Sequence, residues 1–275
     1  MKTLIVPTDF SPAAINAMNY AADMALAINA DILLFHVYSI PVALGEVPLA
    51  LLSVDELKES AEQGVANTKK NLERVTSGKV NIKTETRLGN LVDELETLCK
   101  EITPFAVIMG STGESAIERT LFGSNTLTAI KHLTAPIVCV PQGKEYGLGI
   151  QKIGLACDFR EVVETTPIPV IRDFIKTFNA KLFVLNVDHD NKQFTDDTPV
   201  QSGLLHNQLV ELNPEYHFIV HKDIEDGINE FAEKNNLDLI IAIPKKHKIL
   251  EGLFRKSSTK QLVFEAHVPV MCVHE

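Results

Sequence analysis

The sequence predicts an α/β protein made of two tandem doubly wound domains, each with a parallel sheet that helices cover on both faces. Three observations support this fold class. The chain has 275 residues, and a prior of about 150 residues per domain favours two domains. Short runs rich in Ile, Val and Leu alternate with helical patterns, which is typical of parallel strands joined by right-handed crossovers. The second half also repeats the landmarks of the first, which indicates two copies of one domain.

The strands of the first half are predicted from five apolar runs. These runs are continuous rather than alternating, which indicates burial on both faces of a sheet. They cover residues 3–8, 31–37, 80–86, 105–110 and 136–140.

The first helix is predicted to begin at Ser11-Pro12, because serine is a favoured N-cap and proline a favoured first helical residue. Apolar residues then recur at spacings of three and four, as in a half-buried helix. The same spacing predicts helices around Leu91–Leu98 and Leu127–Leu133, and a weaker one over 53–75. The apolar positions of the first helix are Ala14, Met18, Ala21, Ala22 and Ala25.

The two halves share their opening and closing runs. The openings, 2–10 and 152–159, both end on aspartate followed by phenylalanine. The closings, 135–140 and 268–273, are both apolar strands that contain a proline at their second position. Because an unpaired apolar edge strand favours aggregation, the two closing strands are expected to pair with each other as an internal pseudo-dimer. Association of two chains into a homodimer stays open.

A linker separates the copies. Gly143, Gly147 and Gly149 mark it, and the predicted domains are therefore 1–142 and 151–275. In the second copy Pro167 interrupts the first helix, which is expected to start late.

Composition restricts the partners. Apolar residues make up 45% of the chain, enough for two cores, and the net charge is −10 with both halves acidic. Neither nucleic acid nor a membrane is expected as a partner, because an acidic surface does not attract polyanions. No apolar run reaches the roughly 20 residues of a membrane span, and the N-terminus lacks the long apolar run of a signal peptide. We therefore expect a cytoplasmic protein.

Catalytic and metal motifs are not apparent. The four cysteines are far apart and form no C-x-x-C, so they are interpreted as buried apolar residues. His217 and His221 lie in a predicted strand, and His36 ends another, so structural roles are expected. A nucleophile elbow and an H-E-x-x-H motif do not occur, and no base for attack on a γ-phosphate is recognisable. Binding is therefore expected rather than turnover.

Three glycines follow the predicted strand 105–110, in the spacing Gly110-x2-Gly113-x9-Gly123-Ser124. Glycine permits a positive φ or a close approach of the backbone to a ligand. Ser124 is the predicted N-cap of the next helix, and amides at a helix N-terminus form an anion site without a lysine. Three or four charge-assisted hydrogen bonds of about 1.5–3 kcal/mol each would hold a polyphosphate. The alternative is ordinary turn glycines. Neither the Walker loop nor the dinucleotide fingerprint occurs.

These features resemble the nucleotide-binding motif of the universal stress proteins. The resemblance rests on the glycine pattern, the opening Ile5-Val6-Pro7-Thr8-Asp9-Phe10-Ser11 and the closing Ala135-Pro136-Ile137-Val138-Cys139-Val140, and it covers the whole chain as a tandem pair. It implies a five-stranded parallel sheet in each copy, of the adenine nucleotide α-hydrolase type. It also implies ATP as the ligand, expected with Mg²⁺, and pairing of the copies through their last strands.

The resemblance also implies a role for each matching residue. Asp9 and the backbone of Val37 would hold adenine, and Met109 would pack on the nucleoside. For Asp9 the alternative role is to cap the turn into the helix. Because the glycine pattern accompanies this aspartate, we favour contact with adenine. Pro7, Thr8 and Gly110 would lie near adenine and ribose, and the phosphates would be received by Gly113, Gly123, Ser124, Asn125 and Thr126.

The second copy has lost the glycines. With Phe254 aligned to Phe122, Gly110, Gly113, Gly123 and Ser124 become Ala242, Lys245, Arg255 and Lys256. Because non-glycine residues do not cheaply adopt a positive φ, we predict one nucleotide per chain, held by residues 1–140. The basic residues of 244–256 are interpreted as a solvated loop. The alternative is that they fill the empty site or bind an anionic partner.

Three function classes follow. We favour an ATP-binding stress or regulatory protein that is not an enzyme, with slow hydrolysis still compatible. The alternatives are a nucleotide-free scaffold of the same fold and an enzyme that uses adenylate chemistry.

Overall fold

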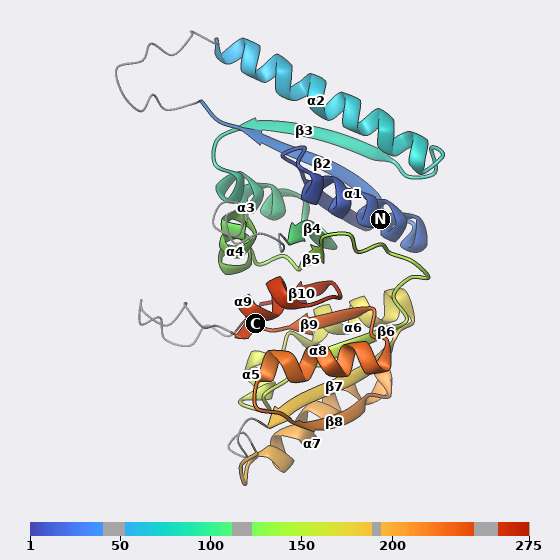
Figure 1. The fold of residues 1–275 in the computed structure, drawn as a ribbon, viewed down its shortest axis with the longest axis vertical. Coiled ribbons are helices and arrows are strands. Elements are labelled where there is room, and N and C mark those ends of the chain that lie inside the picture. The colour runs from blue at the N-terminus through green and yellow to red at the C-terminus, as the bar shows by residue number, and fades with distance from the viewer. Residues whose placement is uncertain (41–52, 112–122, 189–193, 245–257, 275) are drawn as a thin grey trace.

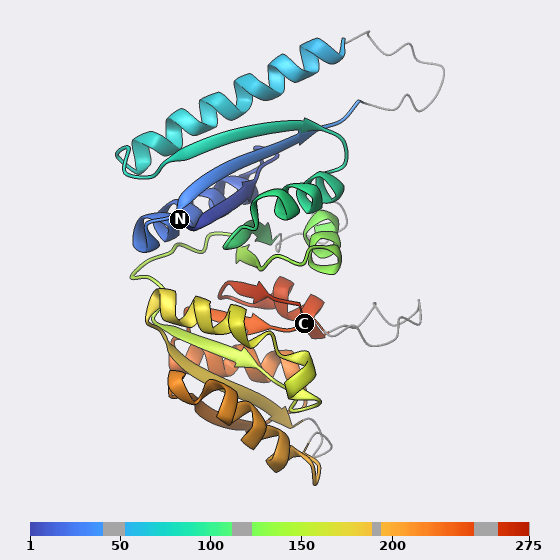
Figure 2. The same cartoon turned by 180° about the vertical axis from the view of Figure 1, so that it is seen from behind.

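The two halves of the chain lie side by side in one sheet (Figures 1 and 2). The structure is a computed structural model that describes residues 1–40, 53–111, 123–188, 194–244 and 258–274. Within these residues the sheet has ten strands in the order β3-β2-β1-β4-β5-β10-β9-β6-β7-β8. The second half of this order mirrors the first, so a pseudo-two-fold axis relates the two halves.

Strands and helices alternate in the first half as the sequence predicts, and all neighbouring strands are parallel. Four of the five predicted strands agree with the structure to within one residue at each end, whereas the third begins at Ile82 rather than at residue 80, because a turn over 76–78 follows the second helix. The elements are β1 Thr3–Pro7, α1 Pro12–Ile28, β2 Asp31–Tyr38, α2 Val54–Val75, β3 Ile82–Leu88, α3 Leu91–Ile102, β4 Ala106–Ser111, α4 Gly123–His132 and β5 Ile137–Pro141.

The second half repeats this order with an irregular start. A short helix, α5, precedes Pro167, and the main helix begins only at Ile168, which confirms the late start predicted from the proline. The elements are β6 Lys152–Ala156, α5 Val162–Thr165, α6 Ile168–Phe178, β7 Lys181–Asp188, α7 Thr198–Leu209, β8 Glu215–Val220, α8 Ile224–Asn235, β9 Leu239–Ala242, α9 Ser258–Glu265 and β10 Val270–Cys272.

The halves join through their last strands. β5 and β10 are antiparallel, with Val138 opposite Met271 at the centre of the pairing. These two residues correspond in the repeat, so the pseudo-two-fold axis passes between them. The expected internal pairing of the closing strands is therefore confirmed. It removes the free edge that each five-stranded sheet would otherwise present.

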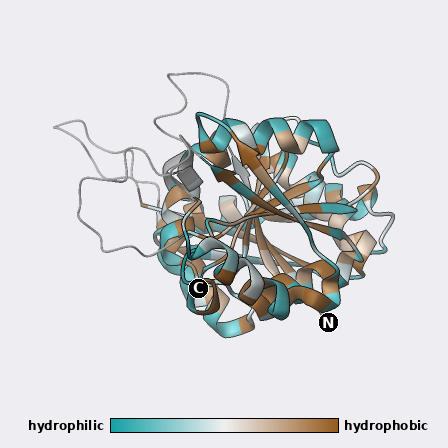
Figure 3. Ribbon diagram, turned by 90° about the horizontal axis from the view of Figure 1, so that it is seen from below, coloured by the Kyte–Doolittle hydropathy of each residue, from teal (hydrophilic) through white to brown (hydrophobic). Residues whose placement is uncertain are grey.

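Two layers of helices cover the sheet, and the apolar residues gather on the strands and on the helix faces that meet them (Figure 3). α1, α2, α6 and α7 pack on one face, whereas α3, α4, α8 and α9 pack on the other. Both apolar clusters contain residues of β5 and β10, so the core continues from one half into the other. The apolar face predicted for α1 is buried throughout.

Aromatic and charged side chains add to the contact between the halves. Phe105, just before β4, stacks on Phe174 of α6 with ring centroids 5.1 Å apart. Lys2 Nζ lies 4.0 Å from the centroid of the Phe105 ring and 2.6 Å from Asp173 Oδ2. The stack buries apolar area on both sides of the junction and is worth more than the exposed ion pair, which contributes at most about 1 kcal/mol.

The N-cap of α8 is expected to make a measurable contribution to the stability of the second half. Asp223 Oδ1 accepts hydrogen bonds from the amides of Glu225 and Asp226 at 3.0 and 3.1 Å. Asp223→Ala is therefore expected to lower the free energy of unfolding by about 1 kcal/mol at neutral pH. The backbone hydrogen bond of Asp226, above all, lowers the pKa of Asp223. The stabilisation is thus complete above the unfolded pKa of about 3.9 and is lost as pH falls through the folded value.

Urea unfolding at pH 7 and pH 3 measures this contribution. The difference between the wild-type chain and Asp223→Ala should shrink at pH 3, whereas Asp223→Asn, which keeps an acceptor oxygen, should lose little at pH 7. An equal deficit of the alanine variant at both pH values would contradict the assignment.

No helix among the described residues is both long and apolar enough to cross a membrane.

Candidate functional site

Most of the predicted site residues lie at the carboxyl edge of the first half. β1 ends at Pro7 and is followed by Thr8 and Asp9, while Val37 is near the end of β2 and Gly110 near the end of β4. β1 lies between β2 and β4, so these three strand ends are adjacent. The strand order reverses between β1 and β4, and open α/β sheets bind ligands at such a switch point. Gly113 lies outside the described residues, and for Gly123 and Ser124 only the backbone is described.

The turn after β1 is held by its own side chains. Thr8 Oγ1 accepts a hydrogen bond from the Phe10 amide at 3.0 Å, and Asp9 Oδ1 accepts one from the Ser11 amide at 3.0 Å. Phe10 adopts a left-handed conformation with φ 64°. The carboxylate of Asp9 therefore caps the turn, which is the role that the sequence interpretation ranked second. It is also exposed at the sheet edge, so contact with adenine stays a prediction.

The second half contains the same turn. Asp158 Oδ1 accepts a hydrogen bond from the Arg160 amide at 3.1 Å, and Phe159 adopts a φ of 52°. Cys157 Sγ replaces Thr8 Oγ1 and accepts a hydrogen bond from the Phe159 amide at 3.4 Å. Because this turn is shared, it does not distinguish a binding copy from a copy that has lost the glycines.

A side chain at the end of the second strand supports the turn in both halves. His36 Nδ1–H donates to the Thr8 carbonyl at 2.7 Å, and the His36 ring lies 4.6 Å from the Phe10 ring. In the second half Asn186 Nδ2 donates to the Cys157 carbonyl at 2.9 Å. These contacts agree with the structural role expected for His36.

Gly110 is required by packing. A Cβ atom at this position would lie 2.7 Å from the carbonyl oxygen of Ala13 and 3.0 Å from its carbonyl carbon. The backbone of α1 therefore crosses β4 too closely for any side chain, whereas the sequence interpretation reserved this space for a ligand. In the second half the corresponding residue is Ala242, and there the main helix begins only at Ile168, which fits the presence of a methyl group.

The start of α4 is tied to β4. Thr126 is buried, and its Oγ1 donates to the Gly110 carbonyl at 3.2 Å. Asn125 is exposed, whereas Met109 is buried in the core shared with α3 and α4. The helix begins at Gly123, so Ser124 lies in the first turn, and its prediction as N-cap was wrong. Serine is favoured both at the N-cap and in the first turn of a helix, so the sequence pattern alone does not separate these two positions.

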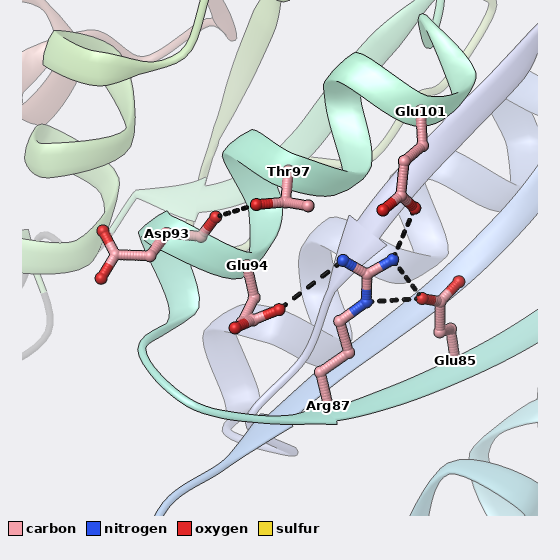
Figure 4. A network of polar contacts seen from close by, with 6 residues as sticks. All are labelled: Glu85, Arg87, Asp93, Glu94, Thr97 and Glu101. Atoms are coloured by element: carbon pink, nitrogen blue, oxygen red, sulfur yellow. Dashed lines mark hydrogen bonds and ion pairs between the residues drawn. The ribbon is translucent and has the colours of Figure 1, made fainter.

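A charged network lies next to the candidate site (Figure 4). Arg87 of β3 is opposite Val37 in the parallel pairing. Its Nε donates to Glu85 Oε1 at 2.6 Å, its Nη2 donates to Glu101 Oε2 at 2.7 Å, and its Nη1 lies 3.6 Å from Glu94 Oε2. Burial acts to lower the pKa of Arg87, but the hydrogen bonds of Glu101 and Glu85 outweigh burial and raise it. These three carboxylates engage the guanidinium, so we do not assign it to a phosphate.

A groove that the sequence did not predict lies beside the turn. Its volume is about 170 Å³, and it opens between α1 and α2. Phe10, Met18 and Leu72 are among its lining residues, with Asn19 and Thr68 as polar members. The only sequence signal for it is the row of apolar positions that α1 and α2 leave partly exposed, which includes Ile15 and Val75. The groove lies on the face of the sheet that α1 and α2 cover, and not between β4 and α4.

Three of the four cysteines are buried, as the sequence interpretation expects, whereas Cys157 is partly exposed. Cys99, Cys139 and Cys272 are buried and no disulfide is formed among them. Burial raises the pKa of Cys99 to about 11, and a hydrogen bond with Cys272 together with burial raises that of Cys139. No cluster of metal-binding side chains occurs among the described residues. The basic positions Lys245, Arg255 and Lys256 lie outside them.

The chain is thus a tandem doubly wound protein: it has two α/β repeats with one strand order, and their last strands pair with each other. The chain belongs to the universal stress protein family. The model of that family matches residues 1–141 and 170–274.

The chain is also similar to individual proteins of known sequence or structure. The universal stress protein MJ0531 of Methanocaldococcus jannaschii is 27% identical over 147 residues, which cover 52% of this chain and 84% of the relative. The crystal structure of a universal stress protein from Archaeoglobus fulgidus DSM 4304 covers 99% of this chain and 96% of its own, with a TM-score of 0.75 at 15% identity. A putative universal stress protein from Pseudomonas aeruginosa UCBPP-PA14 covers 99% of this chain and 93% of its own, with a TM-score of 0.63 at 10% identity. At these identities the two structures show a common fold.

Proposed function

We propose that the chain is an ATP-binding regulatory protein of the stress response, which binds one nucleotide, with Mg²⁺, in its first half. The observation that carries this proposal is the difference between two halves of one architecture. Both have the same strand order and the same capped turn after the first strand, but only the first retains glycines at 110, 113 and 123. Membership of the universal stress protein family supports the proposal.

The proposed site combines strand ends with a helix N-terminus. α4 begins at Gly123 beside the switch point, and amides in the first turn of a helix bind anions through hydrogen bonds and the helix dipole. The attraction of these amides for an anion outweighs the repulsion expected from the net charge of −10. The residues assigned to the nucleotide are Pro7, Thr8, Asp9, Val37, Met109, Gly110, Gly113, Gly123, Ser124, Asn125 and Thr126.

The proposal treats 1–142 as the binding domain and 151–275 as a domain with a degenerate motif. It describes a binding protein rather than an enzyme, located in the cytoplasm, in which the bound nucleotide alters association with a partner. A scaffold without nucleotide is the competing function, and a chain that binds no ATP would favour it.

The matched turns of the two halves provide the test. Asp9→Ala removes a turn cap and the proposed adenine contact, whereas Asp158→Ala removes only the corresponding cap of the second half. ATP affinity is expected to fall about tenfold or more in the first variant, as the loss of a hydrogen bond to a charged group implies, and to stay unchanged in the second. Isothermal titration with Mg-ATP should give one site per chain, and phosphate release should be negligible.

Thermal unfolding provides the control, since both variants should lose similar stability. Two equivalent sites per chain, or an equal loss of affinity in both variants, would contradict the assignment to the first half. Rapid adenylate formation would favour the enzyme.

A further inference from the structure

His274, two residues beyond β10, contacts the other half of the protein. Its Nε2–H donates to the backbone carbonyl of Ile130 in α4. The Nδ1 atom of the same ring is buried and has no hydrogen-bond partner among the described residues. Because a carbonyl oxygen can only accept, Nε2 of this ring carries the hydrogen that is donated to Ile130. Figures 1 and 2 both show β10, the strand that precedes His274, beside β5 at the junction of the two halves.

The contacted carbonyl is one that the helix itself leaves without a donor. α4 ends at His132, and the last four carbonyls of a helix have no amide partner within it. The Leu133 amide donates to the Ala129 carbonyl at 2.9 Å. His274 Nε2–H donates to the next carbonyl, that of Ile130. The C-terminal end of α4 is thus capped by the second half, while Thr126 ties its first turn to β4.

The contact runs in one direction only. In the repeat, His274 corresponds to Pro141, whose side chain has no donor, so the first half cannot cap α9 in the same way. The backbone part of the cap is nevertheless shared, because the Ala266 amide donates to the Leu262 carbonyl of α9 at 2.9 Å. The asymmetry therefore lies in one side chain, and it favours the helix that starts at the glycine motif.

We propose that His274 is a positioning residue for α4, through which the second half sets the affinity of the first half for the phosphates of the nucleotide. α4 has ten residues, less than three turns, so a tilt at Ile130 would also displace the amides at Gly123. This inference rests on the proposed function. It assigns to the degenerate half a role in binding that needs no second nucleotide.

The test compares ATP with adenosine in the full-length chain. His274→Ala is expected to weaken ATP binding about fivefold, the equilibrium equivalent of one net hydrogen bond, and to leave adenosine binding unchanged. His274→Gln places an amide donor near the position of Nε2 and should restore the wild-type affinity. His267→Ala, which removes an exposed histidine of the same half, is the matched control and should change neither affinity.

Hydrogen exchange supplies a readout that needs no ligand. The amides of α4 should exchange faster in His274→Ala than in the wild-type chain, and those of α3 should not. Unchanged exchange in α4, or an equal loss of affinity for ATP and adenosine, would overturn the role of His274. A wild-type chain that binds no nucleotide would instead overturn the proposed function, and the inference with it, while α4 exchange would still report whether the contact exists.

Discussion

Gly123→Val is expected to weaken ATP binding by roughly a hundredfold while the protein still unfolds cooperatively. α4 begins at Gly123, and in the proposed site the amides of this turn point at the phosphates. A valine side chain would occupy the approach to them, and the loss of two charge-assisted hydrogen bonds of about 1.5 kcal/mol each accounts for the expected factor. Valine at a helix start has only a small intrinsic cost. Isothermal titration with Mg-ATP and thermal unfolding of the same samples measure the two effects separately.

Gly203→Val is the matched control for this prediction. Gly203 lies in α7 of the second half, and a Cβ atom there would meet no heavy atom within 4 Å. The Gly203→Val variant therefore introduces the same substitution in a helix away from the site, and its ATP affinity should equal that of the wild-type chain. Unaltered affinity in Gly123→Val would mean that the phosphates do not bind at this helix.

Gly110→Ala is expected to lower the free energy of unfolding by about 3 kcal/mol, the upper part of the range for overpacking a core. The new methyl group would lie 2.7 Å from the Ala13 carbonyl oxygen, which is backbone and cannot rotate away. α1 must shift, and it carries much of the core on its face of the sheet. For a chain of this size the melting temperature should fall by roughly 6–12 °C.

Differential scanning calorimetry with Gly203→Ala as control tests this expectation. The control adds a methyl group in open space and should be neutral or slightly stabilising, because alanine is the better helix former. A Gly110→Ala variant as stable as the wild-type chain would show that α1 does not approach β4 as closely as described.

The elements of the fold were predictable where local chemistry decides them. Ser11 followed by Pro12 predicted the start of α1, and in the structure Ser11 Oγ accepts a hydrogen bond from the Ala14 amide at 3.2 Å. Pro167 likewise predicted the late start of α6. Boundaries without such a local determinant were less accurate: β3 begins two residues later than predicted, and α4 begins before Ser124. At these positions the pairing of strands and the packing of helices decide where the backbone becomes regular.

The candidate site was predictable as a position on the sheet but not as a set of contacts. Because the carboxyl ends of parallel strands meet at one edge, Asp9 and Gly110 were expected near each other. Their actual partners come from elsewhere in the chain. Asp9 caps its own turn, as Asp158 does in the other half, and Gly110 accommodates the backbone of Ala13. An aspartate or glycine after a strand is compatible with both roles, so pattern alone could not choose.

The amino-acid sequence by itself determined the two copies, the alternation of strands and helices and the loss of glycines from the second copy, because hydrophobic periodicity and turn residues act over short distances. Only the tertiary structure decided that α1 excludes a side chain at Gly110, that three carboxylates engage Arg87, and that His274 caps α4 of the opposite half. The contacts of Gly110 with Ala13 and of His274 with Ile130 join residues far apart in the chain. The Arg87 network is closer in sequence but joins β3 to α3, so the geometry of all three exists only once helices and strands have packed. For this reason the sequence pattern of the motif residues is compatible both with a packing role and with the proposed binding role.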